Sequence, residues 1–345
     1  MSGWMIVPYK RFHLYALICG CLLITLLIYR IGSGQLWAQL KLLGWALAPL
    51  ILIEGVADLF HTQAWRHCLS DPHRALPFFR IFCIRMAGYS INYLTPTAGM
   101  GGEVAKGVLL ASDRTGSESA TGIIIDKLSY ALAQLLFVVG GTLVTLPGMR
   151  MPYGIWVAML TATTLLGGGM LIFLVMQKYG KLGAFLRWCV IHRLGGRRME
   201  KLATHITGVD DKLRLFYQRR PGDFIFSIVW HIAGMACGIV QCYYFLRVLT
   251  DQASLGLAAG LWFLGTWFSL LGFALPIDLG VMEATRVIAF VIFGLESSLG
   301  LTYGITLRLE QIFWAGVGLL MYAVLAFEMR KKHISDSGQK GYGMT

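Results

Sequence analysis

The chain has 345 residues, of which 56% are hydrophobic and only 14% are charged. Because about a quarter of the residues in a soluble domain are charged, this composition and a mean hydropathy of +0.64 exclude a soluble globular protein. The net charge of +12 would suit a nucleic-acid partner, but the basic residues gather in one loop and near the chain ends, as they do in membrane proteins. We therefore expect no nucleic-acid partner.

Six apolar runs are each long enough to cross a bilayer as a helix, which takes roughly 18 residues or more. We expect an all-α polytopic membrane protein with about six transmembrane helices, in which residues 1–345 form a single integral membrane domain. The runs are residues 12–29, 42–60, 128–146, 155–176, 224–246 and 301–327.

The first repeat unit, residues 42–147, contains a polar interruption between two of these runs. Charged stretches flank the interruption on both sides, and counting spans from a cytoplasmic N-terminus places both stretches in the cytoplasm. Its two arms, residues 81–94 and 101–111, are each too short to span the membrane. The sequence therefore predicts a re-entrant hairpin that enters from the cytoplasm, with its tip near Pro96.

A basic loop, residues 178–220, follows the first unit and holds eleven of the thirty Lys and Arg residues. Short basic loops stay on the cytoplasmic side. Basic residues also precede the first apolar run and follow the last one, so both termini are predicted to lie on the cytoplasmic side as well. We expect a multi-pass protein of the cell inner membrane with both termini in the cytoplasm.

The second repeat unit, residues 224–327, has the same order of apolar run, polar interruption and apolar run as the first unit, but its orientation in the membrane is inverted. Its segment 254–293 folds around Pro276 and would enter from the outside. Inverted repeats of this kind are a recurrent transporter architecture, in which broken helices meet at the membrane midplane. The prediction is six transmembrane helices with two re-entrant hairpins. The alternative is eight transmembrane helices, because the arms of the second segment are longer.

Both predicted hairpins carry the same pattern of charge. A glutamate follows the proline by seven positions and a base follows the glutamate by three, giving Glu103 with Lys106 and Glu283 with Arg286. Ionisable groups near the bilayer centre cost about 3 kcal/mol each on insertion scales, a cost that a purely structural hairpin could avoid. We interpret the pattern as a duplicated substrate site, with structural charge pairing as the alternative.

The first hairpin also has features of an anion site. Glycines after its proline allow a new helix to start with unpaired amides, and such a start binds anions. Lys106 can pair with Glu103 at i, i+3, and the planar guanidinium of Arg286 suits bidentate contact with phosphate. The candidate substrate-binding residues are Gly99, Gly101, Gly102, Glu103, Lys106, Asp278, Glu283 and Arg286, with Arg85, Asn92 and Arg308 as candidates to line a polar cavity.

Other polar residues inside the apolar runs are weaker candidates. Glu54 and Asp58 lie one turn apart and could carry protons, although Asp58 is near enough to the end of its run to be solvated. His231 lies inside a run and is interpreted as a hydrogen bond between helices, whereas His61 is grouped with two later histidines as part of a loop. Asp126, Lys127 and Glu310 could also line a polar cavity.

Motifs for nucleotide hydrolysis, for serine hydrolases and for zinc proteases do not occur, and the seven cysteines contain no C-x-x-C pair. We expect no cofactor, no metal and no enzyme activity. Energy would come from a partner, an ion gradient or the gradient of the substrate itself.

The sequence NYLTP at residues 92–96, followed by GGEVAK at 101–106, resembles the flippase-like family that includes the transmembrane region of lysylphosphatidylglycerol synthases. Later matches are LP at 275–276, GVMEA at 280–284 and Arg308. Members associated with hopanoid-lipid gene clusters are similar in length. The resemblance implies an inner-membrane protein that moves or presents lipids between leaflets. Because only a short basic tail follows Phe327, we do not expect synthesis of an aminoacyl lipid.

The leading hypothesis is therefore a lipid translocase whose ligands are anionic or glycosylated membrane lipid headgroups, with Lys106 and Arg286 as the bases that bind them. One alternative is a membrane-embedded transferase that acts on a lipid-linked substrate, with Glu103 or Asp278 as general base. Another is a scaffold that transports nothing and binds lipid-synthesis enzymes as partners. The oligomeric state is left open.

Overall fold

The computed structural model of the protein describes residues 29, 33–94, 100–113, 119–145, 153–178, 215–272 and 280–342. The secondary-structure elements in these ranges are all helices, which confirms the predicted all-α fold. They are α2 (Ser33–Leu43), η1 (Gly44–Ala46), α3 (Leu47–Cys68), α4 (Asp71–Arg74), α5 (Phe78–Leu94), α6 (Met100–Asp113), α7 (Ser119–Thr145), α8 (Tyr153–Lys178), α11 (Pro221–Leu249), α12 (Leu255–Gly272), α13 (Val281–Ile292) and α14 (Ser297–Tyr342).

Four helical segments of the described chain are long and apolar enough to cross a membrane, and each overlaps a predicted run. They are Trp37–Cys68, Ala120–Val144, Pro221–Leu249 and Ser297–Lys331. Helix α8 contributes a shorter apolar stretch, Trp156–Gly169. The first predicted run, and most of the basic loop 178–220, lie outside the described residues.

Two pairs of shorter helices occupy the places of the predicted hairpins. Helices α5 and α6 have 17 and 14 residues, and α12 and α13 have 18 and 12 residues. At 1.5 Å per residue the shorter arm of each pair is about 20 Å long, well below the roughly 30 Å of a hydrocarbon core. This length supports re-entrant hairpins over eight full spans. The tips, residues 95–99 and 273–279, lie outside the described residues.

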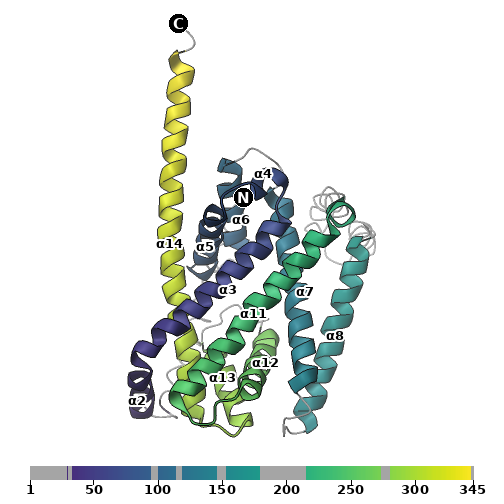
Figure 1. Ribbon diagram of the computed structural model, residues 1–345, viewed down its shortest axis with the longest axis vertical. Coiled ribbons are helices and arrows are strands. Elements are labelled where there is room, and N and C mark those ends of the chain that lie inside the picture. The colour runs from purple at the N-terminus through teal and green to yellow at the C-terminus, as the bar shows by residue number, and fades with distance from the viewer. Residues whose placement is uncertain are drawn as a thin grey trace, which may run out of the picture.

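The two hairpins lie at opposite ends of the helix bundle (Figure 1). Helices α3 and α11 cross the middle side by side and in opposite directions, and they form the most extensively packed helix pair. The α5–α6 hairpin follows the upper end of α3, and the α12–α13 hairpin follows the lower end of α11. This arrangement agrees with the predicted inverted topology.

Glycines allow the closest contacts between these helices. A Cβ atom on Gly102 of α6 would lie 2.0 Å from the carbonyl oxygen of Gly88 on α5, so the two arms of the first hairpin touch backbone to backbone. On α14, a Cβ atom on Gly300 would lie 2.7 Å from the Cα of Val287, and one on Gly304 would lie 2.9 Å from the Cα of Glu283. Side chains at these positions would push the helices apart.

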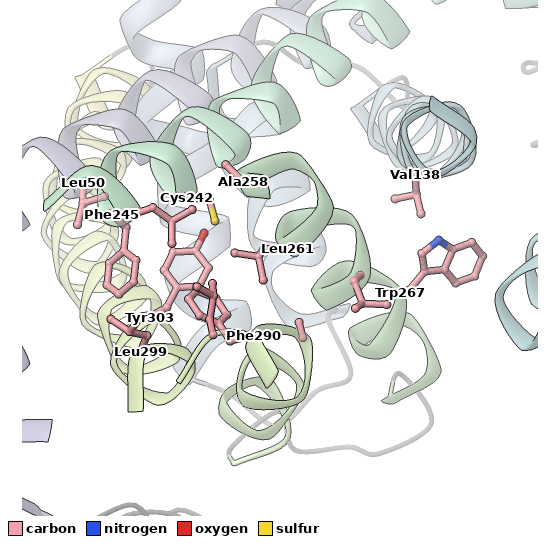
Figure 2. Close-up of a cluster of buried hydrophobic side chains, with 14 of the residues drawn as sticks. Leu50, Val138, Cys242, Phe245, Ala258, Leu261, Trp267, Phe290, Leu299 and Tyr303 are labelled. Atoms are coloured by element: carbon pink, nitrogen blue, oxygen red, sulfur yellow. The ribbon is translucent and has the colours of Figure 1, made fainter. Parts of the chain in front are cut away.

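The apolar core is divided into two clusters, one beside each hairpin. Around the second hairpin, Tyr303 packs against Phe245 and Phe290 with ring centroids 4.9 and 5.7 Å apart, and all three rings are buried (Figure 2). Around the first, Trp65 and Cys68 of α3 pack with residues of α5, α6 and α7. Because α3 joins one cluster at Leu50 and the other at Trp65, its polar residues between these positions lie at the centre of the bundle.

Candidate functional site

The acid–base pair of the first hairpin forms as predicted. The Nζ atom of Lys106 lies 3.1 Å from a carboxylate oxygen of Glu103, and the Nζ atom of Lys127 on α7 lies 2.8 Å from the other. Lys106 is buried, with its Nζ atom 5.4 Å from the ring centroid of Trp65. Glu103 therefore neutralises two bases from two helices, and neither the Lys127 contact nor Trp65 follows from the local motif.

The glycine-rich start of α6 is bonded within the hairpin. The amide N–H of Gly102 donates to the side-chain oxygen of Asn92 at 2.6 Å, and the Asn92 amide donates weakly to Glu103 at 3.4 Å. Asn92 can reach across because the backbones of the two arms touch at the glycines described above. The role of Gly102 as an amide donor to a ligand stays a prediction, since this amide is already engaged. Gly101 lies in the same first turn, and Gly99 lies outside the described residues.

The acid of the second hairpin has a different partner from the one that its spacing suggests. Glu283 is almost fully buried, accepts the amide N–H of Gly280 at 2.9 Å, and pairs with Arg308 of α14 at 2.9 Å. The pairing of Glu283 with Arg286 that their i, i+3 spacing would allow is therefore absent from the described contacts. The cause is the close approach of α14 at its two contact glycines, because Arg308 lies one turn beyond them on the same helix face.

Arg286 is left buried without a described carboxylate partner. It is 9% exposed, and its Nε and Nη1 atoms make no hydrogen bond to a described residue. Its guanidinium carbon lies 5.9 Å from the ring centroid of Tyr303. A Cβ atom on Gly265 of α12 would lie 1.8 Å from Nη1, so this glycine makes room for the guanidinium. Asp278 lies outside the described residues.

Arg286 borders a cavity of about 200 Å³ between the second hairpin and helices α3, α7, α11 and α14, which we call the central cavity. This volume holds a small polar group and is below the 300–1,000 Å³ that is typical of pockets for whole small molecules. Its lining combines a guanidinium with carboxylates from two other helices. The polar lining residues are Glu54, His61, Tyr130, Gln241, Arg286, Glu310 and Gln311.

One wall of the central cavity is fixed by a glutamine that sequence reasoning missed. Gln241 of α11 donates to a carboxylate oxygen of Glu310 at 2.8 Å and to the backbone carbonyl of Leu50 at 3.1 Å. The other carboxylate oxygen of Glu310 is buried and has no hydrogen-bond partner among the described residues. A glutamine in the middle of a long apolar helix is the signal that could have identified it.

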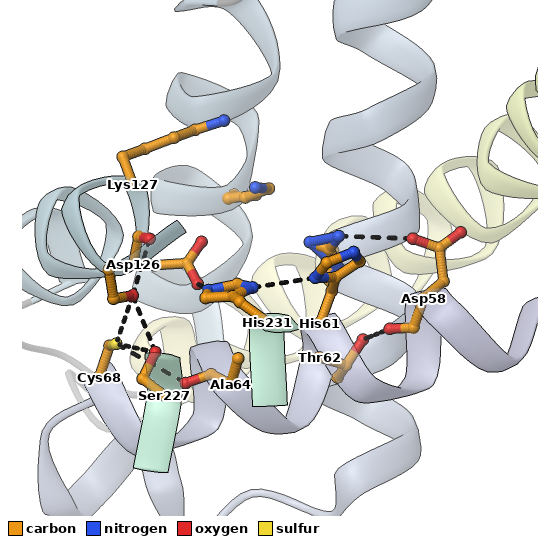
Figure 3. A network of polar contacts seen from close by, with 12 residues as sticks. Asp58, His61, Thr62, Ala64, Cys68, Asp126, Lys127, Ser227 and His231 are labelled. Carbon is orange, nitrogen blue, oxygen red and sulfur yellow. Dashed lines mark hydrogen bonds and ion pairs between the residues drawn. The ribbon is translucent and has the colours of Figure 1, made fainter. Parts of the chain in front are cut away.

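A chain of buried polar contacts continues from the central cavity toward the first hairpin (Figure 3). Nδ1 of His61 lies 2.9 Å from Nδ1 of His231, and Nε2 of His231 lies 3.2 Å from a carboxylate oxygen of Asp126. The predicted helix-to-helix hydrogen bond of His231 is confirmed. The assignment of His61 to a loop is wrong, because α3 continues through it.

Two further sequence candidates lie beside this chain. Arg85 of α5 contacts Asp58 of α3 at 3.4 Å, and both side chains are mostly buried. The pair therefore occupies the polar centre of the bundle, and neither residue lines the central cavity.

A second cavity, of about 370 Å³, lies at the ends of α3, α7 and α11 that face the basic loop. Leu69, Ile125 and Phe216 give it an apolar lining, with Arg219 and Arg220 at its edge. Arg220 is paired with Asp71, and its hydrogen bond holds the pKa of that carboxyl below the ordinary value. Among the described residues, the buried base without a carboxylate partner is therefore Arg286, at the central cavity.

These features define a polytopic helical membrane protein with two oppositely placed helix hairpins, in which the second hairpin borders a cavity with a polar lining. The family model described as the lysylphosphatidylglycerol synthase TM region matches residues 14–318, and the chain belongs to this family. The family comprises membrane proteins related to lipid modification or translocation, and the match includes both hairpins and the central cavity. No curated protein and no solved structure matched the chain.

Proposed function

We propose that this protein is a translocase for lipids with an anionic, phosphate-bearing headgroup in the bacterial inner membrane. The headgroup binds in the central cavity beside Arg286, and the acyl or isoprenoid chains stay in the surrounding lipid. The observation that carries the proposal is the buried guanidinium of Arg286, which borders a polar cavity and has no carboxylate partner among the described residues.

The electrostatics of Arg286 favour an anionic ligand. A buried charge without a partner is costly, and an oppositely charged group that hydrogen-bonds to it offsets this cost. The planar fork of a guanidinium matches two oxygens of a phosphate, which gives geometric specificity as well as attraction. Lys106 fits this role less well, because Glu103 already neutralises it at 3.1 Å. Arg286 is therefore the principal headgroup contact in the proposal.

The placement of the hairpins supports movement across the membrane. Helices α5 and α6 lie toward one end of the bundle and α12 and α13 toward the other (Figure 1). In transporters built from inverted repeats, a fixed site near the midplane opens alternately to each side as one repeat moves against the other. A headgroup bound at Arg286 could then leave toward either leaflet.

The test is transfer of fluorescent phosphatidylglycerol in proteoliposomes, measured as the fraction of label that an impermeant quencher reaches over time. We expect Arg286→Gln to lower the transfer rate at least tenfold. Arg247→Gln, which changes an exposed arginine on α11, is the matched control and should transfer like the wild type. Wild-type rates in Arg286→Gln would remove this residue from the mechanism.

Two further measurements make this test specific. A fluorescent diacylglycerol lacks the phosphate, so its transfer rate should be the same in the wild type and in Arg286→Gln. Mass spectrometry of the recovered phosphatidylglycerol should show an unchanged lipid, whereas a chemically altered lipid would favour the transferase alternative. Arg286→Gln should change the free energy of unfolding by no more than about 2 kcal/mol, the scale of a buried cation–π contact such as the one with Tyr303.

A further inference from the structure

We propose that His61, His231 and Asp126 form a proton-transfer path between the central cavity and the first hairpin, and that this path couples headgroup movement to a proton gradient. The coupling rests on the proposed function, whereas the path itself rests on geometry. The three side chains come from α3, α11 and α7 and follow one another in a line (Figure 3). All three are buried or partly buried, away from bulk water.

The path begins at the central cavity, which His61 lines. The Nε2 atom of His61 makes no hydrogen bond to a described residue, while its Nδ1 atom contacts His231 at 2.9 Å. Gly234 of α11 makes room for the ring, because a Cβ atom there would lie 2.7 Å from its Cε1 atom. The ring of His61 is thus held with one nitrogen on the next member of the path and the other left available.

An ionised Asp126 would set which nitrogen carries each proton. An ionised carboxylate can only accept hydrogen bonds, so the Nε2 atom of His231 that faces Asp126 carries a proton. The Nδ1 atom of neutral His231 is then an acceptor, and the Nδ1 atom of His61 is the donor across the 2.9 Å contact. Both donated protons therefore point from the cavity toward Asp126.

One proton can cross this path without leaving a charged ring behind. A proton from the cavity binds Nε2 of His61, the Nδ1 proton of His61 moves to Nδ1 of His231, and the Nε2 proton of His231 moves to Asp126. One proton enters at His61 and one arrives at Asp126, so each ring gains one proton and loses one. In the resulting state every donor and acceptor along the path has exchanged its role, which gives two alternative arrangements of the same contacts.

The His231–Asp126 contact is longer and less well aligned than the contact between the two rings. The two atoms are 3.2 Å apart, within ion-pair distance, but they are not aligned for a hydrogen bond, and neither atom makes a hydrogen bond to any other described residue. Catalytic hydrogen bonds are often long in a resting structure and shorten in the working state. A small rotation of either side chain would complete this bond.

Charged side chains surround the path. Arg85 and Lys106 are the bases that act on both Asp126 and His231. Tyr130 packs against both rings, with centroids 5.5 and 5.2 Å away. The other titratable groups that face the path are Glu54 and Asp58 on α3 and Cys68 near Asp126.

Arrival of a proton at Asp126 changes the charge of the first hairpin. Asp126 is one of the carboxylates whose charge attracts Lys106, together with Glu103 and Asp58. Once Asp126 is neutral, Lys106 loses one of these attractions, and the balance of charge between α6 and α7 shifts. Because the hairpin is held to α7 through these groups, proton arrival biases the position of the element that would have to move.

The first test uses the transfer assay with a pH difference across the proteoliposome membrane. We expect the wild-type transfer rate to change at least fivefold with the gradient, and His231→Gln and Asp126→Asn to lose this response. His67→Gln is the matched control, because His67 lies on α3 but pairs with Asp223 outside the path, and it should respond like the wild type. A wild-type rate indifferent to the gradient, or a full response in His231→Gln, would overturn the coupling.

The second test does not depend on lipid transfer. In protein labelled with ¹⁵N-histidine, nuclear magnetic resonance should show His61 protonated at Nδ1 and His231 at Nε2, with the signals assigned through His61→Gln and His231→Gln. The opposite tautomers, or two charged rings at neutral pH, would overturn the path.

If the wild type moves no lipid, the proposed function fails. Proton entry under a membrane potential, followed with an internal pH dye, then decides whether the path exists. A flux lost in Asp126→Asn supports it, and a flux equal to that of empty liposomes overturns it.

Discussion

The two hairpins have the same spacing of proline, glutamate and base, but they use the base differently. In the first, Glu103 pairs with the base of its own motif and with Lys127. In the second, Glu283 pairs with Arg308 of α14, and Arg286 is left beside the central cavity. The difference shows that a repeated motif fixes which residues are present, whereas the neighbouring helix decides which of them stays free to bind a ligand.

The largest expected effect is the loss of stability on removing Glu283, which should exceed the loss on removing Glu103. Glu283→Ala leaves Arg308 without its carboxylate and the Gly280 amide without its acceptor, and removing one member of a buried pair typically costs about 3 kcal/mol or more. Glu103 is more exposed, with 16% of its side chain accessible against 1% for Glu283. Glu103→Ala should therefore cost less. Denaturant titration in mixed micelles measures both, and equal losses would mean that the two glutamates support their hairpins alike.

An intermediate effect is expected where the arms of the first hairpin touch. Gly102→Ala would place a methyl group 2.0 Å from a backbone oxygen that cannot rotate away, and overpacking of this kind costs about 1–3 kcal/mol. Gly107→Ala on the same helix is the control, because its nearest contact would be an ordinary 3.7 Å. A Gly102→Ala variant as stable as the Gly107→Ala variant in the same titration would show that the arms separate easily.

The smallest effect is expected at the outer edge of the first hairpin. Lys127→Ala removes an ion pair whose lysine side chain is 53% exposed, and exposed pairs contribute about 1 kcal/mol or less. Lys106 keeps Glu103 as its partner in this variant. A loss above about 2 kcal/mol in the same titration would exceed that range and would make Lys127 as important to the first hairpin as Arg308 is to the second.

Local patterns in the sequence predicted much of the fold. The lengths of the apolar runs and the two prolines located the arms of both hairpins within a few residues, and the i, i+3 spacing of Glu103 and Lys106 identified a contact within one helix turn. These features depend only on neighbours in the chain. The helix ends at Leu94 and Met100 match the predicted arms closely.

The remaining contacts join residues far apart in the chain, so they depend on how helices pack. Arg308 reaches Glu283 across 25 positions and His61 reaches His231 across 170. Neither separation leaves a periodic signal, and a single histidine in a helix does not reveal its partner. The spacing of Gly300, Gly304 and Arg308 at four-residue intervals is a signal that could have indicated the first of these contacts.

Gly300 and Gly304 carry no charge, yet they set the position of α14 and so influence whether Arg286 at the central cavity is paired. A Cβ atom on Gly304 would lie 2.9 Å from the Cα of Glu283, so a larger residue there would move α14 outward and take Arg308 with it. Glu283 would then turn to the base one helical turn away on its own helix, and the second hairpin would acquire the closed pairing of the first. Variants that carry larger residues at these two positions should therefore lose the unpaired guanidinium of Arg286, even with every ionisable residue unchanged.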